Sequence, residues 1–118
     1  MKAFSINAEN RTVTEVRLGK DYKEIYTLLG EGVDMFQCVD ISDNGDTLYV
    51  DEEGLLKPQD NFFLYKGYNQ PLAGNGLVLG TTDEGESTSP KISLKEVVEN
   101  VVFMNRYEVV QWAKRNGQ

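Results

Sequence analysis

Side chains that carry oxygen recur at short intervals between Asp40 and Asp51, with a spacing similar to that of a calcium-binding loop. If Asp40 is counted as position 1, oxygen-bearing side chains occupy positions 1, 3, 5, 7 and 12, and Gly45 stands at position 6. Calcium favours this arrangement because a hard cation needs several oxygen ligands around a sharp glycine turn. The candidate metal ligands are Asp40, Ser42, Asn44, Asp46 and Asp51.

Three features of the same segment argue against a metal site. Leu48 occupies position 9, an aspartate replaces the bidentate glutamate of position 12, and the flanking residues have the pattern of strands rather than helices. The pair Asn44-Gly45 between two β-prone runs is typical of a hairpin turn. We therefore expect a solvated turn here, and neither a bound metal nor another cofactor.

A second candidate site combines carboxylates and aromatic side chains from the middle of the chain. Exposed aromatic residues beside a glycine-rich loop stack on bases or anchor partner proteins. We expect the binding surface to consist of Asp51, Glu52, Glu53, Asn61, Tyr65 and Tyr68. The alternative for each aromatic residue is packing in the core, which aromatic side chains dominate in small proteins. Trp112 can likewise be interpreted in two ways. It either packs over a sheet as a lid or anchors a homodimer.

The residue inventory disfavours catalysis. The chain has no histidine and a single cysteine, Cys38, which excludes histidine-based triads, an intrachain disulfide and a cysteine-cluster metal site. The adjacent acids Asp51, Glu52 and Glu53 have the residue types of a general acid and base, but no nucleophile is placed beside a base. The glycines at 74 and 76 are not followed by the Lys-Ser/Thr of a phosphate loop. We expect a protein that is not an enzyme, with Cys38 buried in a strand.

The charge of the chain is acidic and unevenly distributed. It has 12 basic and 19 acidic side chains in 118 residues, a net charge of −7, and residues 31–60 hold nine of the acids and one base. Such a segment repels phosphate, so nucleic-acid binding is disfavoured. The longest purely apolar run, Val101–Met104, is far shorter than a membrane span. We expect no signal peptide and no membrane association, and a cytoplasmic location.

The first 90 residues have mainly strand patterns. Residues 4–8 and 12–18 alternate and predict a hairpin. A short helix over 21–29 follows, with Asp21 and Glu24 spaced as a capping box and Gly30 as its C-terminal cap. Further strands are expected over 36–41, 48–51, 61–65 and 76–80, and residues 81–90 have the composition of an exposed connector.

The last 28 residues have helical spacing. Ser93 and Glu96 form a second capping-box pattern, and the apolar positions from Leu94 to Val102 fall on one helical face. A break near Asn105 and a second helix over 107–114 follow. The fold is predicted to be α+β: a mixed or antiparallel sheet of about five strands, one short helix after the first hairpin, and C-terminal helices. We expect a single domain over 1–118, with a β-rich core over 1–90 and a helical tail over 91–118.

Six segments in this order resemble a known family. They are residues 1–6, 21–30, 48–57, 61–63, 72–80 and 83–86. Together they are similar to a family of small uncharacterised domains spread through tailed phages, plasmids and phage-like bacterial islands, over about residues 1–90. The chain departs from the family pattern where Glu31 separates Gly30 from Gly32, and in the tail after Pro90. The resemblance implies an origin in a mobile element and supplies no catalytic residues.

Taken together, these observations predict an accessory protein of a phage or mobile element that acts as a non-catalytic binding module. Its partner is an unidentified protein or small ligand, a homodimer is possible, and its location is the cytoplasm of the host cell. One alternative is an acidic DNA mimic or another counter-defence inhibitor of a host enzyme, whose binding weakens steeply with salt. The other is a binder of a small molecule or nucleotide, which needs a pocket with a few convergent polar groups.

Overall fold

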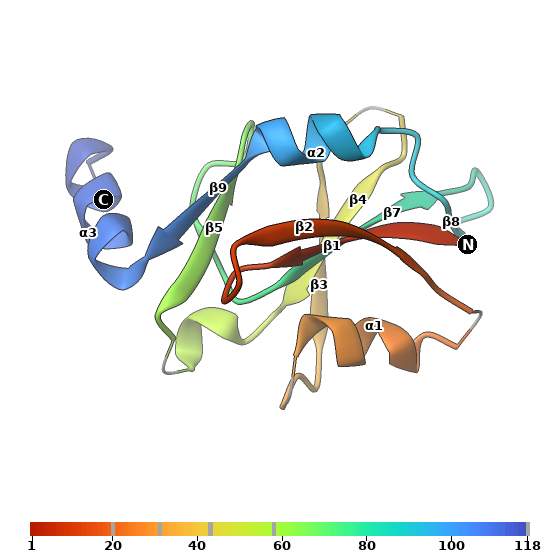
Figure 1. The fold of residues 1–118 in the computed structure, drawn as a ribbon, viewed down its shortest axis with the longest axis horizontal. Helices are drawn as coiled ribbons and strands as arrows, with labels where there is room; N and C mark the ends of the chain where they lie inside the picture. The colour runs from red at the N-terminus through yellow and green to blue at the C-terminus, as the bar shows by residue number, and fades with distance from the viewer. Residues whose placement is uncertain (20, 31, 43, 58, 118) are drawn as a thin grey trace.

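An antiparallel six-stranded sheet lies at the centre of the computed structural model, which describes residues 1–19, 21–30, 32–42, 44–57 and 59–117 (Figure 1). The main path of the sheet runs in the order β2 (Thr12–Arg17), β1 (Lys2–Asn7), β7 (Gly76–Thr81), β4 (Thr47–Asp51) and β3 (Phe36–Asp40). The short strand β8 (Ser87–Thr88) pairs with β7. The predicted α+β class is confirmed, and the sheet is larger than the expected five strands.

Two predicted hairpins form this sheet, and β7 joins them. In the first hairpin Lys2 pairs with Arg17 and Asn7 with Thr12. In the second, β3 and β4 pair from Phe36 opposite Asp51 to Asp40 opposite Thr47. The strand β7 is antiparallel to both β1 and β4, so it brings the polar loop between β3 and β4 close to its own C-terminal end.

A second sheet has the order β6 (Leu72–Ala73), β5 (Asn61–Tyr65) and β9 (Val101–Asn105). The prediction that the helix after Ser93 continues through Val102 is wrong. The helix α2 (Leu94–Asn100) ends at Asn100, and β9 begins at the next residue, Val101. Its predicted N-cap is confirmed, since the Ser93 side chain accepts a hydrogen bond from the Glu96 N–H. The run Val-Val-Phe-Met suits a strand, and β9 pairs with β5 over all five of its residues.

The core follows from the alternation of the central strands. On one face, Leu77 and Leu79 of β7 pack beneath α1 (Lys23–Leu29), against Ile25 and Leu29. On the other face, Val78 packs with side chains from the second sheet and from α2. Figure 1 shows α1 and α2 on opposite sides of the central sheet. The central sheet is therefore covered on both faces.

The start of α1 differs from the predicted capping box. The N-cap is Tyr22, and the Asp21 carboxylate accepts a hydrogen bond from the Lys23 N–H at 2.9 Å. Glu24 reaches back further than expected, to the N–H of Gly19 at 2.8 Å. The predicted C-terminal cap is confirmed, since Gly30 follows the helix and its N–H bonds to a carbonyl oxygen of the last turn.

The C-terminal helix α3 (Arg106–Arg115) covers the outer face of the second sheet, beyond β9 in Figure 1. Asn105 caps it in a reciprocal capping box with Glu108, which confirms the predicted break. Trp112 packs against a small cluster formed by Phe62, Ala73 and Met104. Of its two interpretations, the structure supports the lid over a sheet. A short 3₁₀ helix, η1 (Gly54–Leu56), completes the elements of the described chain.

Candidate functional site

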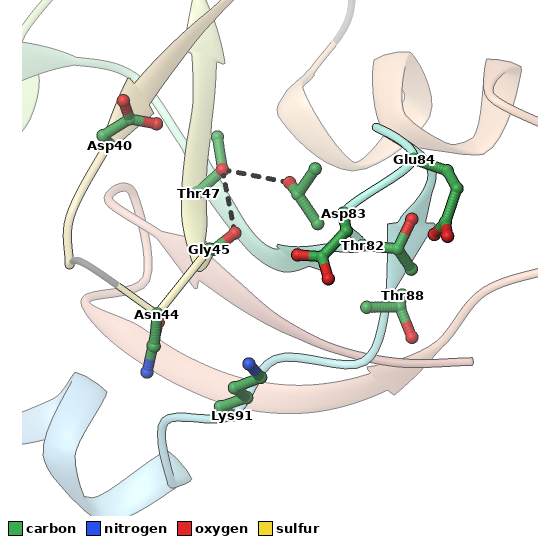
Figure 2. A pocket seen from close by; sticks show the side chains of 10 residues that line it. Asp40, Asn44, Gly45, Thr47, Thr82, Asp83, Glu84, Thr88 and Lys91 are labelled. Atoms are coloured by element: carbon green, nitrogen blue, oxygen red, sulfur yellow. Dashed lines mark hydrogen bonds between the residues drawn. The ribbon is translucent and has the colours of Figure 1, made fainter.

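A polar hollow of about 660 Å³ lies between the β3–β4 loop and the β7–β8 hairpin (Figure 2). We call it the threonine hollow. Its lining consists of Asp40, Asn44, Gly45, Thr47, Thr81, Thr82, Asp83, Glu84, Thr88 and Lys91. The lining thus contains three carboxylates, four threonine hydroxyls and one ammonium group, so it is rich in hydrogen-bond acceptors and carries a negative charge.

Close contact between β4 and β7 positions the first part of this lining. The hydroxyls of Thr47 and Thr81 lie 3.3 Å apart, and Thr47 also donates to the Gly45 carbonyl at 3.3 Å (Figure 2). Gly45 has a φ of 94°, and a Cβ at this position would stand 2.8 Å from the Thr81 carbonyl oxygen. Glycine is therefore required for the loop to approach β7.

The turn between β7 and β8 positions the second part. The Thr82 N–H donates to the Glu86 carbonyl at 2.8 Å, and the Thr82 hydroxyl accepts from the Glu86 N–H at 3.1 Å. These bonds close a tight turn whose tip presents the exposed side chains of Asp83 and Glu84. Figure 2 shows Asp83 and Lys91 on facing sides of the hollow.

The backbone at Lys91 is fixed by a buried aspartate. Asp46 is 1% exposed, and its two carboxylate oxygens accept hydrogen bonds from the N–H groups of Lys91, at 2.9 Å, and Ile92, at 2.7 Å. Bonds between a carboxylate and backbone N–H groups are among the stronger hydrogen bonds in proteins. Asp46 therefore holds the segment that carries Lys91 against the β3–β4 loop.

The candidate metal ligands do not converge. Asp40 and Asn44 both line the threonine hollow, and the Asn44 Oδ1 accepts a hydrogen bond from the Ser42 hydroxyl within the loop. Asp46 points into the protein, and Asp51 lies at the opposite end of β4. The described residues contain no group of three or more histidine, cysteine or carboxylate side chains placed to hold a metal ion. The predicted hairpin is confirmed by the β3–β4 pairing, but the expectation of a solvated turn is wrong for Asp46, which is 1% exposed; Asp43 lies outside the described residues.

The predicted binding surface is divided by the fold. Asp51 and Asn61 line one small cavity, beside which Glu52 is exposed and Glu53 half-buried. Tyr65 is 2% exposed, so its expected place on a binding surface is wrong: the second face of β5 packs into the core. Tyr68 is half-buried beyond the far end of β5 from Asn61. These residues do not form one surface.

Cys38 is exposed, and the prediction that it is buried is wrong. It lies on the edge strand β3, where the neighbouring Val39 is buried in the core and the Cys38 side chain points to the opposite face. Partial desolvation still raises the pKa of the thiol, while a hydrogen bond with Tyr49 acts in the opposite direction. The protonated thiol is a weak nucleophile, since the thiolate is the reactive form.

The threonines of the hollow were missed by reasoning from the sequence, which treats residues 81–90 as a connector. A signal was present in the run Thr81-Thr82-Asp83-Glu84, because four consecutive side chains there carry oxygen. Its partner Thr47 lies 34 residues before Thr81, and only the pairing of β4 with β7 brings these two residues together. Lys91 is near in the chain, and its backbone is held beside the hollow by Asp46.

Comparison with families of known sequences assigns the chain to one of them. Residues 1–101 match the model of a family described as Domain of unknown function (DUF3846). The chain belongs to this family. The match extends past residue 90, the expected limit of the resemblance, and includes α2, so most of β9 and all of α3 lie beyond it. No curated protein and no solved structure matches the chain.

The helices of the described residues were also compared with the requirements of a bilayer. None of them is both long enough and apolar enough to cross a membrane.

Proposed function

We propose that this DUF3846 domain is a non-catalytic binding module of a phage or another mobile element, and that its threonine hollow binds a cationic segment of a partner protein. The observation that carries the proposal is the composition of the lining, with three carboxylates, four hydroxyls and one ammonium group. The resemblance of residues 1–90 to domains of phages and plasmids supports the mobile-element origin.

The chemistry of the hollow suits lysine and arginine side chains. Ammonium and guanidinium groups are donors without acceptors, and carboxylates are acceptors without donors, so the two are complementary. A single exposed ion pair contributes only about 0–1 kcal/mol, and a partner must therefore engage several lining groups at once. The contacts are open to solvent, and salt weakens them over a screening length of about 8 Å at physiological ionic strength.

The same geometry supports binding without catalysis. The Thr47 hydroxyl bonds to the Thr81 hydroxyl and to a carbonyl oxygen, and within the described residues neither hydroxyl is hydrogen bonded to a carboxylate that could act as its base. Cys38, the residue type most nucleophilic near neutral pH, has a raised pKa and is not among the residues that line the hollow.

The experiment is a titration of the ¹⁵N-labelled protein with hexalysine and hexaarginine, followed by amide chemical shifts. We expect shifts concentrated at Thr47, Thr81, Thr82 and Thr88. The triple variant D40N/D83N/E84Q removes the carboxylates of the hollow and should weaken binding about tenfold, which corresponds to about 1.4 kcal/mol.

The matched control is E15Q/D34N/E99Q, which removes three exposed carboxylates outside the hollow. Both triple variants change the net charge from −7 to −4, and the control should bind the peptides as the natural chain does. Equal weakening in the two variants would contradict a local site. That result would instead support the acidic mimic, which acts through the charge of the whole surface.

A further inference from the structure

A second cavity, of about 190 Å³, lies where the end of β4 meets the C-terminal end of α1 and the turn between β6 and β7. We call it the amide cavity, because three carboxamide side chains line it: Gln59, Asn61 and Asn75. Its apolar lining includes Leu29 and Val33. The volume equals that of about six water molecules at ~30 Å³ each, which suits a small planar molecule.

Three charged side chains line the amide cavity: Asp51 and Lys57 compensate each other, and the exposed Glu9 leaves the lining with a net charge of −1. The Asp51 side chain is 8% exposed, and its Oδ2 lies 2.7 Å from Nζ of Lys57. Its Oδ1 accepts a hydrogen bond from the Glu53 N–H at 3.0 Å, and the Lys57 ammonium also donates to the Gly32 carbonyl at 2.8 Å. Both charges are therefore already bonded within the protein. Among the described residues of the lining, no cation is left to attract a phosphate or carboxylate.

Two of the carboxamides are fixed by bonds through their oxygen atoms. The Gln59 Oε1 accepts from the Asn61 N–H at 3.1 Å, and the Asn75 Oδ1 accepts from the Ala8 N–H at 2.9 Å. Their NH₂ groups are left as donors. The Gln59 Nε2 lies next to Gly74. A Cβ added to this glycine would be 3.5 Å from that nitrogen.

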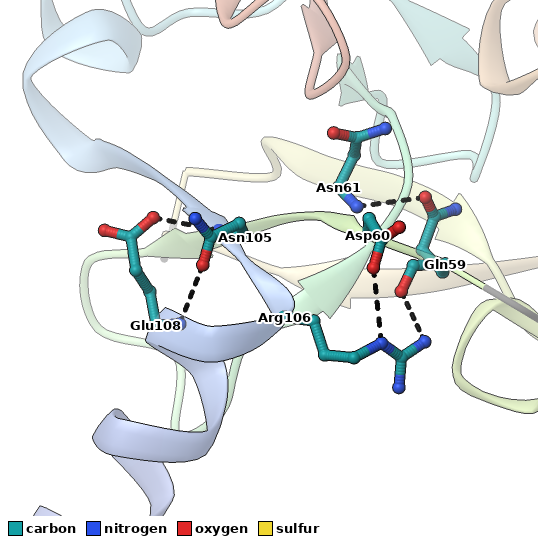
Figure 3. Close-up of polar contacts among 6 residues, drawn as sticks. All are labelled: Gln59, Asp60, Asn61, Asn105, Arg106 and Glu108. Carbon is teal, nitrogen blue, oxygen red and sulfur yellow. Dashed lines mark hydrogen bonds and ion pairs between the residues drawn. The ribbon is translucent and has the colours of Figure 1, made fainter.

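Asn61 differs from Gln59 and Asn75, because its hydrogen bonds within the protein are made by its backbone and not by its side chain. Its N–H bonds to Gln59, and its carbonyl accepts from the Gly74 N–H at 2.9 Å. In Figure 3 its side-chain amide points away from the contacts of Arg106. Arg106 holds the neighbouring wall, donating to the Gln59 carbonyl at 2.5 Å and to Asp60 at 3.3 Å. Asn61 thus offers a donor and an acceptor on a fixed strand end.

We propose that the amide cavity binds a small neutral molecule whose planar edge alternates hydrogen-bond donors and acceptors, and that a purine base is the chemical class it takes. Asparagine and glutamine carboxamides pair with the N6 and N7 edge of adenine through two hydrogen bonds. The apolar wall of Leu29 and Val33 supplies contacts for a ring face. This site is separate from the threonine hollow and does not depend on the function proposed for it.

Adenine is the probe, with benzimidazole as a ring of similar shape that lacks the amino group and with AMP as the phosphate-bearing form. In ¹⁵N spectra, adenine should shift the side-chain NH₂ signals of Asn61 and Gln59, and it should raise the melting temperature in a concentration-dependent way. Benzimidazole and AMP should bind more weakly than adenine. The substitution N61A should weaken adenine binding about tenfold, within the range expected for a bidentate amide contact.

N61A keeps both backbone hydrogen bonds of Asn61, and N69A is the matched control in an exposed loop position. N69A should leave adenine binding unchanged. The proposal is overturned if adenine at millimolar concentration shifts none of these NH₂ signals in the natural chain, or if N61A binds it equally well. Shifts at Thr81 and Thr88 instead would place the base in the threonine hollow and would also overturn it. The peptide titration of the threonine hollow is unaffected by any of these outcomes.

Discussion

Asp46 illustrates how a side chain with the chemistry of a metal ligand is used to hold two segments together. Its position in the Asp40–Asp51 run suggests coordination, but its carboxylate is buried and bonded to two backbone N–H groups 45 and 46 residues further along the chain. The Asp46 N–H is itself bonded to the side chain of Asn44, at 3.0 Å. Asp46 therefore connects the β3–β4 loop to the segment that enters α2.

The substitution D46N tests this role. An amide retains one acceptor and turns an NH₂ group toward the second N–H, so one hydrogen bond to a charged group is lost. We expect the free energy of unfolding to fall by about 1.5–3 kcal/mol, measured by urea denaturation. The control D40N changes an exposed carboxylate of the same hairpin and should stay within about 0.5 kcal/mol. A D46N protein as stable as the natural chain would refute the structural role.

At the scale of elements, Glu108 stabilises the start of α3. Its Oε1 accepts from the Asn105 N–H at 3.0 Å, and Arg11 of the β1–β2 turn lies 3.3 Å from the same oxygen. The hydrogen bond from the Asn105 backbone is the main cause of the lowered pKa of Glu108; desolvation opposes it, and Arg11 adds further, smaller lowering. A lowered pKa in the folded state means that the ionised form stabilises the fold.

This stabilisation has a defined pH dependence. It is fully present above about pH 4.3, where an unfolded glutamate is ionised, and it is lost as the pH falls through the lower pKa of the folded state. We expect E108Q to be less stable than the natural chain at pH 7, and the difference to shrink as the pH falls through the lowered pKa of Glu108 in the folded state. Urea unfolding followed by the fluorescence of Trp112, the single tryptophan, measures both. A difference that stayed constant over this pH range would contradict the assignment.

The strands and hairpins could be predicted from the sequence because their signals are local. Alternation over 4–8 and 12–18, turn residues around Asn44 and a cap at Ser93 each act within a few positions. The assignment of Val101 and Val102 failed because their spacing fits a helix, while their β-branched side chains fit a strand equally well. The pairing with β5 decides for the strand, and β5 lies about 40 residues earlier in the chain, outside any local pattern.

The candidate sites could be predicted less well than the elements. Asp51 and Asn61 were chosen for their residue types, and both line the amide cavity. The turn and the 3₁₀ helix between them in the chain bring them there, and the residue types alone do not predict this. Tyr65 was chosen for its ring and is in the core, because the second sheet is covered on both faces. Which face of a strand is exposed depends on which other elements pack on it. The residues near the strand in the sequence do not indicate which elements these are.

At the scale of the whole molecule, the limit of the family match and the limit of the folded core do not coincide. The match ends at residue 101, whereas β9 continues to Asn105 and forms the longer of the two pairings of β5. Beyond β9, α3 covers the cluster of Phe62, Ala73 and Met104. The segment after the family match is therefore required to complete the second sheet and to cover its outer face.

Two truncations separate these contributions. A chain of residues 1–101 leaves β5 paired only with the two-residue β6, and we expect it to lose cooperative unfolding and the dispersed amide spectrum of the second sheet. A chain of residues 1–105 restores β9 but exposes Phe62 and Met104, which are 6% and 7% exposed in the full chain. Each buried apolar side chain contributes about 1.5–3 kcal/mol, so the longer truncation should unfold cooperatively at lower urea concentration than the full chain. If residues 1–101 unfolded with the midpoint and slope of the full chain, the matched region would be a self-sufficient domain and the second sheet dispensable.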